Sequence, residues 1–191
     1  MHTIHRNGWR CLLAAGCLWV GVAHAGVDTQ AYSAYAAYKS GNYEEARRLW
    51  SAAAERGSTD AMINLANLYV QGQGVARDLV AAAAWYRRAA EAGDPVAQVH
   101  LGEAYEAGSG VARDNQAAAR WFREAAAQGD AQGAFNLGVM LATDFGAGLE
   151  HSSHAQRVAA LEWLAQAAEA GHREARTLHR SLQSLMDADS R

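Results

Sequence analysis

The chain has 191 residues, 17 basic and 20 acidic side chains, and a formal net charge of −3. This mildly acidic balance argues against nucleic acid as a partner, because proteins that bind DNA or RNA present basic surfaces. Both cysteines, Cys11 and Cys17, lie in the first 25 residues, so the rest of the chain has no thiol for a disulfide bond or a thiolate metal site.

Residues 1–25 have the pattern of a cleaved export signal. Arg6 and Arg10 give a basic start, an apolar run follows over 11–22, and Ala25 ends a small-x-small cleavage pattern. The apolar run is too short to span a bilayer, so we expect no integral membrane segment after cleavage. An alternative is a lipoprotein modified at Cys17, but the apolar run before that cysteine would be very short.

Cleavage after Ala25 would leave 15 basic against 20 acidic side chains, a net charge of −5. Lys39 is the only lysine, against sixteen arginines, which is typical of a bacterium with GC-rich codons. We therefore expect the mature protein in the bacterial periplasm or outside the cell.

Residues 26–57 predict one pair of antiparallel helices. Tyr32, Tyr35 and Tyr38 line the first helix, and Gly41 lies in the predicted turn. Trp50 follows in the second helix.

A pattern of 36 residues then occurs twice, over 58–93 and 94–129. A fixed period in the thirties is the mark of a helical repeat array. The copied pairs include Leu65 and Leu101, Tyr69 and Tyr105, Gly72 and Gly108, Gly74 and Gly110, Asp78 and Asp114, and Trp85 and Trp121.

Each copy predicts two helices, which we call helix A and helix B. Ser58 or Asp94 is suited to cap helix A, and Asp78 or Asp114 to cap helix B. Between the two helices, paired glycines allow the positive φ of a tight turn. Helix A is expected to bury Ala61, Leu65 and Tyr69 or their copies, and the tryptophans of helix B are interpreted as core residues.

A third copy spans 130–171 with six extra residues, inserted near 146–156. Ser153 and Gln156 have the spacing of a capping box, which predicts a longer helix B. His151 and His154, with Glu150, have loop spacing for metal ligands, but the fuller ligand set of a metal site is not visible and we favour a solvated insertion.

Residues 172–191 predict a capping helix and tail. Its expected apolar stripe comprises Leu178, Leu182 and Leu185, and Ala175 takes the repeat position of helix A.

These motifs resemble the SEL-one-like repeat (SLR) family, a branch of the tetratricopeptide (TPR)-like superfamily. The family pattern is Ala-x-x-x-Leu-Gly-x-x-Tyr-x-x-Gly-x-Gly-Val-x-x-Asp, followed by a helix with Trp and paired alanines. The segment 94–129 matches nearly every position, and 58–93 departs only at Ala66. The resemblance implies an all-α, right-handed α-solenoid with a TPR-like first hairpin over 26–57, three SLR repeats and a C-terminal capping helix.

Some cysteine-rich relatives in this family have been linked to β-lactams. Serine β-lactamases use Ser-x-x-Lys, which Lys39 cannot form because Ala36 stands three residues before it. We predict no enzyme and no catalytic, cofactor-binding, metal or disulfide residue. The alternatives are an enzyme or enzyme-associated factor acting on cell-wall or β-lactam-type substrates, and a purely structural assembly subunit.

The resemblance implies an exported, non-catalytic scaffold that binds a protein or peptide on the concave face formed by the A helices. Residues that are not copied between repeats must then provide the specificity, and the oligomeric state stays open. The predicted partner-binding residues are Asp60, Asn64, Asn67, Gln71, His100, Glu103, Gln132 and Asn136.

Overall fold

The computed structural model describes residues 31–144, 146, 148 and 151–189. The predicted export signal, Cys17 and Glu150 lie outside these residues. Within the described part, all regular structure is helical, which confirms the predicted all-α solenoid. A helix over residues 31–39 comes first. The others are α2 (Tyr43–Ala54), α3 (Thr59–Gln71), α4 (Leu79–Glu91), α5 (Pro95–Ala107), α6 (Asn115–Ala127), α7 (Ala131–Ala142), α8 (His154–Glu169) and α9 (Arg173–Asp189).

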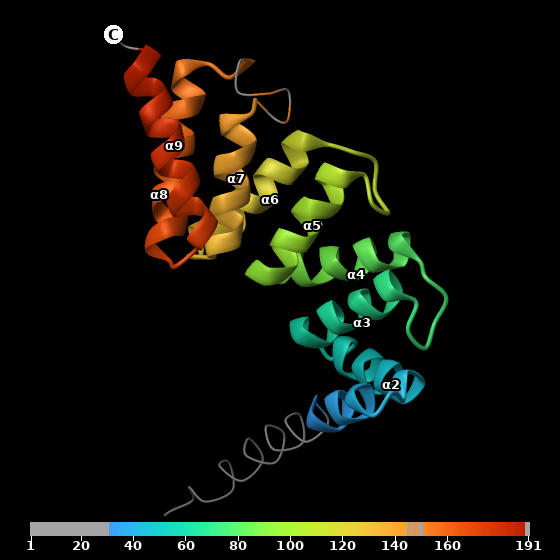
Figure 1. Ribbon diagram of the computed structural model, residues 1–191. Coiled ribbons are helices and arrows are strands. Elements are labelled where there is room, and N and C mark those ends of the chain that lie inside the picture. Colours follow the sequence, from blue (N-terminus) through green and yellow to red (C-terminus); the bar gives the residue numbers. More distant parts are fainter. Residues whose placement is uncertain (1–30, 145, 147, 149–150, 190–191) are drawn as a thin grey trace, which may run out of the picture.

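The helices stack in chain order into a curved array (Figure 1). Three hairpins, α3–α4, α5–α6 and α7–α8, have the most extensive internal packing, and each hairpin then packs on the next through adjacent helices. The α3–α4 and α5–α6 loops lie along the same edge of the array. A stack of this kind buries a continuous core that one hairpin could not bury alone.

The predicted helix caps are present in the structure. Ser58 and Asp94 accept hydrogen bonds from the backbone N–H groups of the first turns of α3 and α5. Asp78 and Asp114 do the same for α4 and α6. Each cap satisfies a backbone donor that has no partner within the helix. The helix boundaries therefore follow from local sequence.

Gly74 and Gly110 serve a second purpose besides their positive φ angles of 66° and 74°. A Cβ atom at Gly74 would lie 2.6 Å from the Cβ of Tyr43, at the start of α2. At Gly110 it would overlap the backbone carbonyl oxygen of Leu79, at the start of α4. The turn of each hairpin thus packs closely against the preceding helix B.

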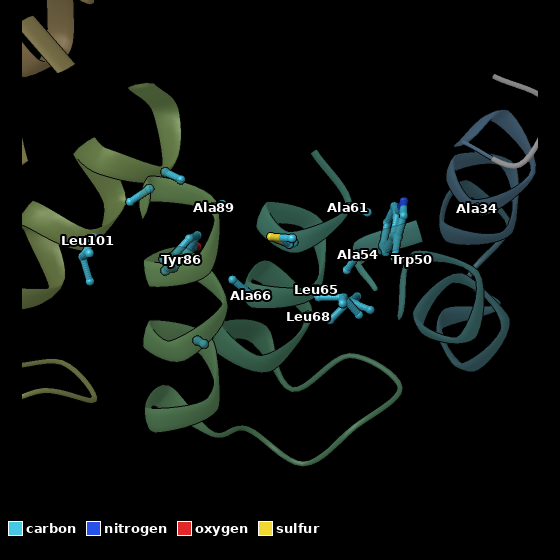
Figure 2. Close-up of a cluster of buried hydrophobic side chains, with 14 of the residues drawn as sticks. Ala34, Trp50, Ala54, Ala61, Leu65, Ala66, Leu68, Tyr86, Ala89 and Leu101 are labelled. Carbon is cyan, nitrogen blue, oxygen red and sulfur yellow. The ribbon is translucent and has the colours of Figure 1, made fainter. Parts of the chain in front are cut away.

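The buried core runs along the array as a series of clusters. Figure 2 shows the N-terminal cluster, which passes from Ala34 through Trp50 and Leu65 to Tyr86 and Leu101. Two further clusters continue it, and their buried members come from α5, α6 and α7 and from α6 to α9.

The tryptophans occupy the core less fully than predicted. Trp50 is 5% exposed, but Trp85, Trp121 and Trp163 are only half-buried. The next residue in each helix takes the innermost position in their place, since the helix turns by about 100° per residue. These innermost residues are Tyr86, Phe122 and Leu164.

The predicted capping box is confirmed in α8. The Ser153 side chain accepts from the Gln156 backbone, and the Gln156 side chain accepts from the Ser153 backbone at 2.7 Å. Ser153 lies ten residues before Trp163, whereas Asp78 lies seven residues before Trp85. The insertion therefore adds three residues to the start of this helix B.

The expected stripe of α9 is wrong at one position. Ala175 and Leu182 are buried, and Leu178 and Met186 pack against the same cluster. Leu185 is instead 40% exposed. The stripe therefore runs from Leu178 through Leu182 to Met186, in two steps of four residues. No helix in the described part of the chain combines the length and apolar character needed to cross a bilayer.

Candidate partner-binding surface

The eight predicted partner-binding residues lie on α3, α5 and α7, and none of them is buried. The structure does not unite them in one continuous site. It divides seven of them among two grooves and one hydrogen-bonded group, and Gln71 lies exposed at the end of α3, outside these three.

The first groove, which we call the central groove, lies between α3 and α5 and has a volume of about 440 Å³. Three predicted residues line it: Asn67 from α3, and His100 and Glu103 from α5. Arg77, Leu79, Tyr86 and Ser109 also line it. The remaining lining residues have small apolar side chains, and they are Val70, Ala82, Ala83, Ala104 and Ala107.

Tyr86 of α4 connects the polar residues of the central groove. Its hydroxyl group donates a hydrogen bond of 2.6 Å to Oδ1 of Asn67, and its ring centroid lies 4.9 Å from that of His100. Nδ1 of His100 in turn lies 3.3 Å from Oε2 of Glu103. The chain of contacts joins α3, α4 and α5 and holds these side chains in place.

The environment of Tyr86 keeps its hydroxyl group protonated. Burial, and then the negative charge of Glu103, raise the pKa of Tyr86 from 10.0 to about 12. The hydroxyl group is therefore a hydrogen-bond donor to Asn67 at any physiological pH.

The second groove, which we call the N-terminal groove, has a volume of about 410 Å³. It contains the predicted residues Asp60 and Asn64. Tyr35 and Val96, which also line it, are 52% and 47% exposed. This groove therefore combines a carboxylate and an amide with accessible apolar surface.

Gln132 and Asn136 form the third group, on α7. Nε2 of Gln132 donates to Oδ1 of Asn136 at 2.8 Å, and Oε1 of Gln132 lies 3.3 Å from Nε2 of His172. His172 stacks on Phe135 with a centroid distance of 4.1 Å. These side chains are engaged with one another across the junction of α7 and α9.

Tyr86 is a residue of the central groove that was not among the predicted partner-binding residues. It is 7% exposed, yet its hydroxyl group reaches Asn67 and its ring lines the central groove. A signal was present, because the copied position in the next repeat is Phe122, which has no polar atom.

Among the described residues, no group of three or more His, Cys, Asp or Glu side chains is placed to hold a metal ion. His151 and His154 belong to the described residues, and Glu150 does not.

The family model of the Sel1 repeat matches residues 33–58, 59–94, 95–130 and 131–172, so the chain belongs to the Sel1 repeat family. The predicted resemblance is thereby confirmed. The match over 33–58 covers most of the hairpin that the sequence likened to a TPR unit, and the family model counts four repeats in all.

Two solved structures illustrate the similarity. A Sel1 repeat protein from Oxalobacter formigenes is 30% identical with a TM-score of 0.66, over 76% of this chain and 57% of that protein. A protective antigen with an SLR fold from uropathogenic Escherichia coli is 34% identical with a TM-score of 0.65, over 73% of this chain and 29% of that protein. The chain thus spans little more than half of the first protein and under a third of the second. No curated protein matches the sequence significantly.

Proposed function

We propose that this protein is an exported, non-catalytic interaction module that binds an extended protein segment in the central groove. Sel1 repeat proteins are generally scaffolds for protein–protein interaction. The observation that carries the proposal is the groove itself, where Asn67, His100 and Glu103 lie beside a wall of small side chains.

The groove suits a peptide backbone for two physical reasons. Alanines such as Ala83 and Ala104 let a chain approach the helices closely, and each peptide unit needs both a donor and an acceptor. Tyr86 already occupies Oδ1 of Asn67, which leaves the NH₂ group of Asn67 as a donor for a partner. Glu103 supplies acceptor oxygens on the other side of the groove.

Export is supported by the signal pattern over residues 1–25. One similar protein is described as a protective antigen. Fractionation of cells that express the full chain tests this part of the proposal. Recovery of the uncleaved chain in the cytoplasm would contradict it.

Partner binding is tested with one change in each of the three groups: Asn64→Ala, His100→Ala and Asn136→Ala combined. Partners are first captured by crosslinking in the native envelope and identified by mass spectrometry. The triple variant should lose most of this capture while its helical melting curve stays almost unchanged. The matched control carries three alanines at exposed B-helix positions: Gln116, Arg123 and Glu162.

A second variant isolates the central groove. Ala107→Trp places a large side chain at the rim of this groove, where Ala107 is exposed, so the fold should tolerate it. Ala127→Trp, at an equally exposed position on α6, is the control. Capture that survives Ala107→Trp and the triple variant would contradict the proposed face. Turnover of a β-lactam that one point mutation abolishes would favour the enzymatic alternative.

A further inference from the structure

A third groove contains none of the predicted partner-binding residues and is larger than the central and N-terminal grooves. It has a volume of about 610 Å³, and its lining residues come from α4, α5 and α6 and from the turn between α4 and α5. We call it the interhelical groove. Its lining includes Trp121 and two carboxylates, Glu91 of α4 and Glu124 of α6, and none of its lining residues belongs to the central groove.

The repeat that precedes the interhelical groove has a side-chain contact at the equivalent position. Counting back 36 residues, Trp85 corresponds to Trp121, Glu55 to Glu91, and Arg88 to Glu124. The Arg88 guanidinium lies 4.5 Å from the centroid of the Trp85 ring, and its Nη1 lies 3.1 Å from Oε1 of Glu55. A guanidinium therefore joins α2 to α4 between an aromatic face and a carboxylate.

The repeat that follows the interhelical groove also has a side-chain contact between its helix B and the preceding helix B. Measured from its tryptophan, Trp163, Gln166 holds the place that Arg88 holds after Trp85. Its Nε2 atom donates to the backbone oxygen of Ala126 at 2.8 Å, which joins α6 to α8.

The interhelical groove lacks a guanidinium link of this kind. Its helices are linked instead through Gln98 of α5, whose Nε2 donates to the backbone oxygen of Ala90 at 3.3 Å and whose Oε1 accepts from Nε2 of Gln128 at 2.9 Å. Within the part of the chain that the structure describes, neither Glu91 nor Glu124 has an ion-pair partner, and no cation lies over Trp121. Two glutamates also cannot pair with each other, since like charges repel. The aromatic face and the carboxylate of the preceding repeat are thus present here, and the guanidinium between them is missing.

Two arginines of the described residues, Arg87 and Arg120, also line this groove, and neither of them lies over the Trp121 ring. Arg87 donates from Nη2 to the hydroxyl group of Tyr105 at 3.0 Å, and its guanidinium lies over the Tyr105 ring. Arg120 is exposed and has no ion pair among the described residues.

We propose that the interhelical groove is a receptor for an arginine side chain of a partner protein. The guanidinium of that arginine lies over Trp121 and between Glu91 and Glu124, as Arg88 lies over Trp85 and beside Glu55. This site is independent of the central groove, so it adds a second point of attachment. One exposed arginine binds weakly by itself, and its effect is to fix the register of a partner that is also held elsewhere.

The test follows the indole N–H signal of Trp121 by NMR while N-acetyl-L-arginine amide is added to the full chain. The signal should move and saturate with arginine, and it should move far less with N-acetyl-L-lysine amide at equal ionic strength, since ammonium lacks the planar fork. Equal responses to both compounds, or none, would overturn the proposal.

Three variants make the test specific. Glu124→Arg supplies the missing guanidinium from the chain itself, so it should raise the melting temperature and remove the Trp121 response. Arg88→Glu recreates the open arrangement one repeat earlier, so Trp85 should gain a response to arginine. The double variant Glu91→Gln and Glu124→Gln keeps the shape and should weaken the response about tenfold. A Trp121 response that persists unchanged in Glu124→Arg and in the double variant rejects the assigned residues.

Discussion

Gly110 and Gly93 have similar backbone angles, φ 74° and 93°, but different surroundings. A side chain at Gly110 would overlap the Leu79 carbonyl oxygen, whereas nothing lies within 4 Å of a Cβ at Gly93. Gly110→Ala should therefore lower the free energy of unfolding by about 2–4 kcal/mol, from backbone strain plus the displaced helix. Urea denaturation measures it.

Gly93→Ala is the matched control for that experiment. It adds the same methyl group at a positive φ in open space, so only the strain of about 1 kcal/mol is expected. Equal losses of stability in both variants would mean that the contact with Leu79 does not matter.

Tyr86→Phe removes the hydroxyl group that bonds to Asn67 at 2.6 Å. We expect a loss of about 1 kcal/mol, because the ring still fills its place and one hydrogen bond is lost. Asn67→Ala, which removes the other partner, should cost a similar amount, and the double variant should cost less than the sum.

The same tyrosine predicts a pH dependence of stability. Its pKa is 10.0 unfolded and about 12 folded, so between these values the unfolded chain releases the proton first. The stability that depends on the neutral hydroxyl group is complete below pH 10 and is lost as the pH rises toward about 12. Melting temperatures across this range should fall more steeply for the natural protein than for Tyr86→Phe. Parallel curves would show that Tyr86 titrates normally.

At the scale of single residues, the sequence predicted the features that depend only on residues nearby in the chain, such as helix caps. The caps at Ser58 and Asp94 depend only on neighbouring residues and were predictable. The role of Tyr86 depends on Asn67, 19 residues away, and on His100 in the next hairpin. Spacing along one helix does not contain that information, which is why the predicted site residues were not expected to fall into separate groups.

At the scale of one helix, α8 shows how an insertion is accommodated. The capping box at Ser153 starts the helix three residues earlier than in the other repeats. Ser153→Ala should cost about 1 kcal/mol, because the Gln156 backbone N–H loses its acceptor. Amide hydrogen exchange should accelerate most in the first turn of α8.

Ser184→Ala is the matched control for the helix cap. Ser184 is exposed within α9, away from a helix end, and alanine is a good helix former. It should leave the exchange rates of α8 unchanged. A similar effect of both variants would mean that the capping box contributes nothing.

In α9 the sequence pattern did not determine which residue ends the apolar stripe. Leucine at 178, 182 and 185 suggested a stripe, but Met186 takes the last position in the structure. A step of three residues from Leu182 to Leu185 and a step of four residues to Met186 are both compatible with helical spacing. Only the packing surface that α8 presents selects between them.

At the scale of the molecule, nearest-neighbour packing predicts that a core substitution destabilises only the helices near it. Leu182 is 3% exposed in the cluster shared by α7, α8 and α9. Leu182→Ala should destabilise this end by about 2–5 kcal/mol. Hydrogen exchange should rise in α7 to α9 and change little in α2 and α3, since a repeat contacts only its neighbours.

Leu185→Ala removes a leucine of the same helix that is 40% exposed, and it should have a much smaller effect. Uniform loss of protection along the whole array in Leu182→Ala would show that the array unfolds as one cooperative unit. The repeat period made the architecture predictable at this scale, because hairpins of one repeated pattern have few ways to stack.

Gly74 packs closely against α2, and Gly110 packs closely against α4. This packing has a mechanical consequence. A force that pulls the two ends of the array apart is carried through these junctions in series, since each hairpin holds mainly to the next. Extension would then proceed by release of single hairpins, with the tension falling after each event. A tether built in this way absorbs a sudden load stepwise before the whole chain is straightened.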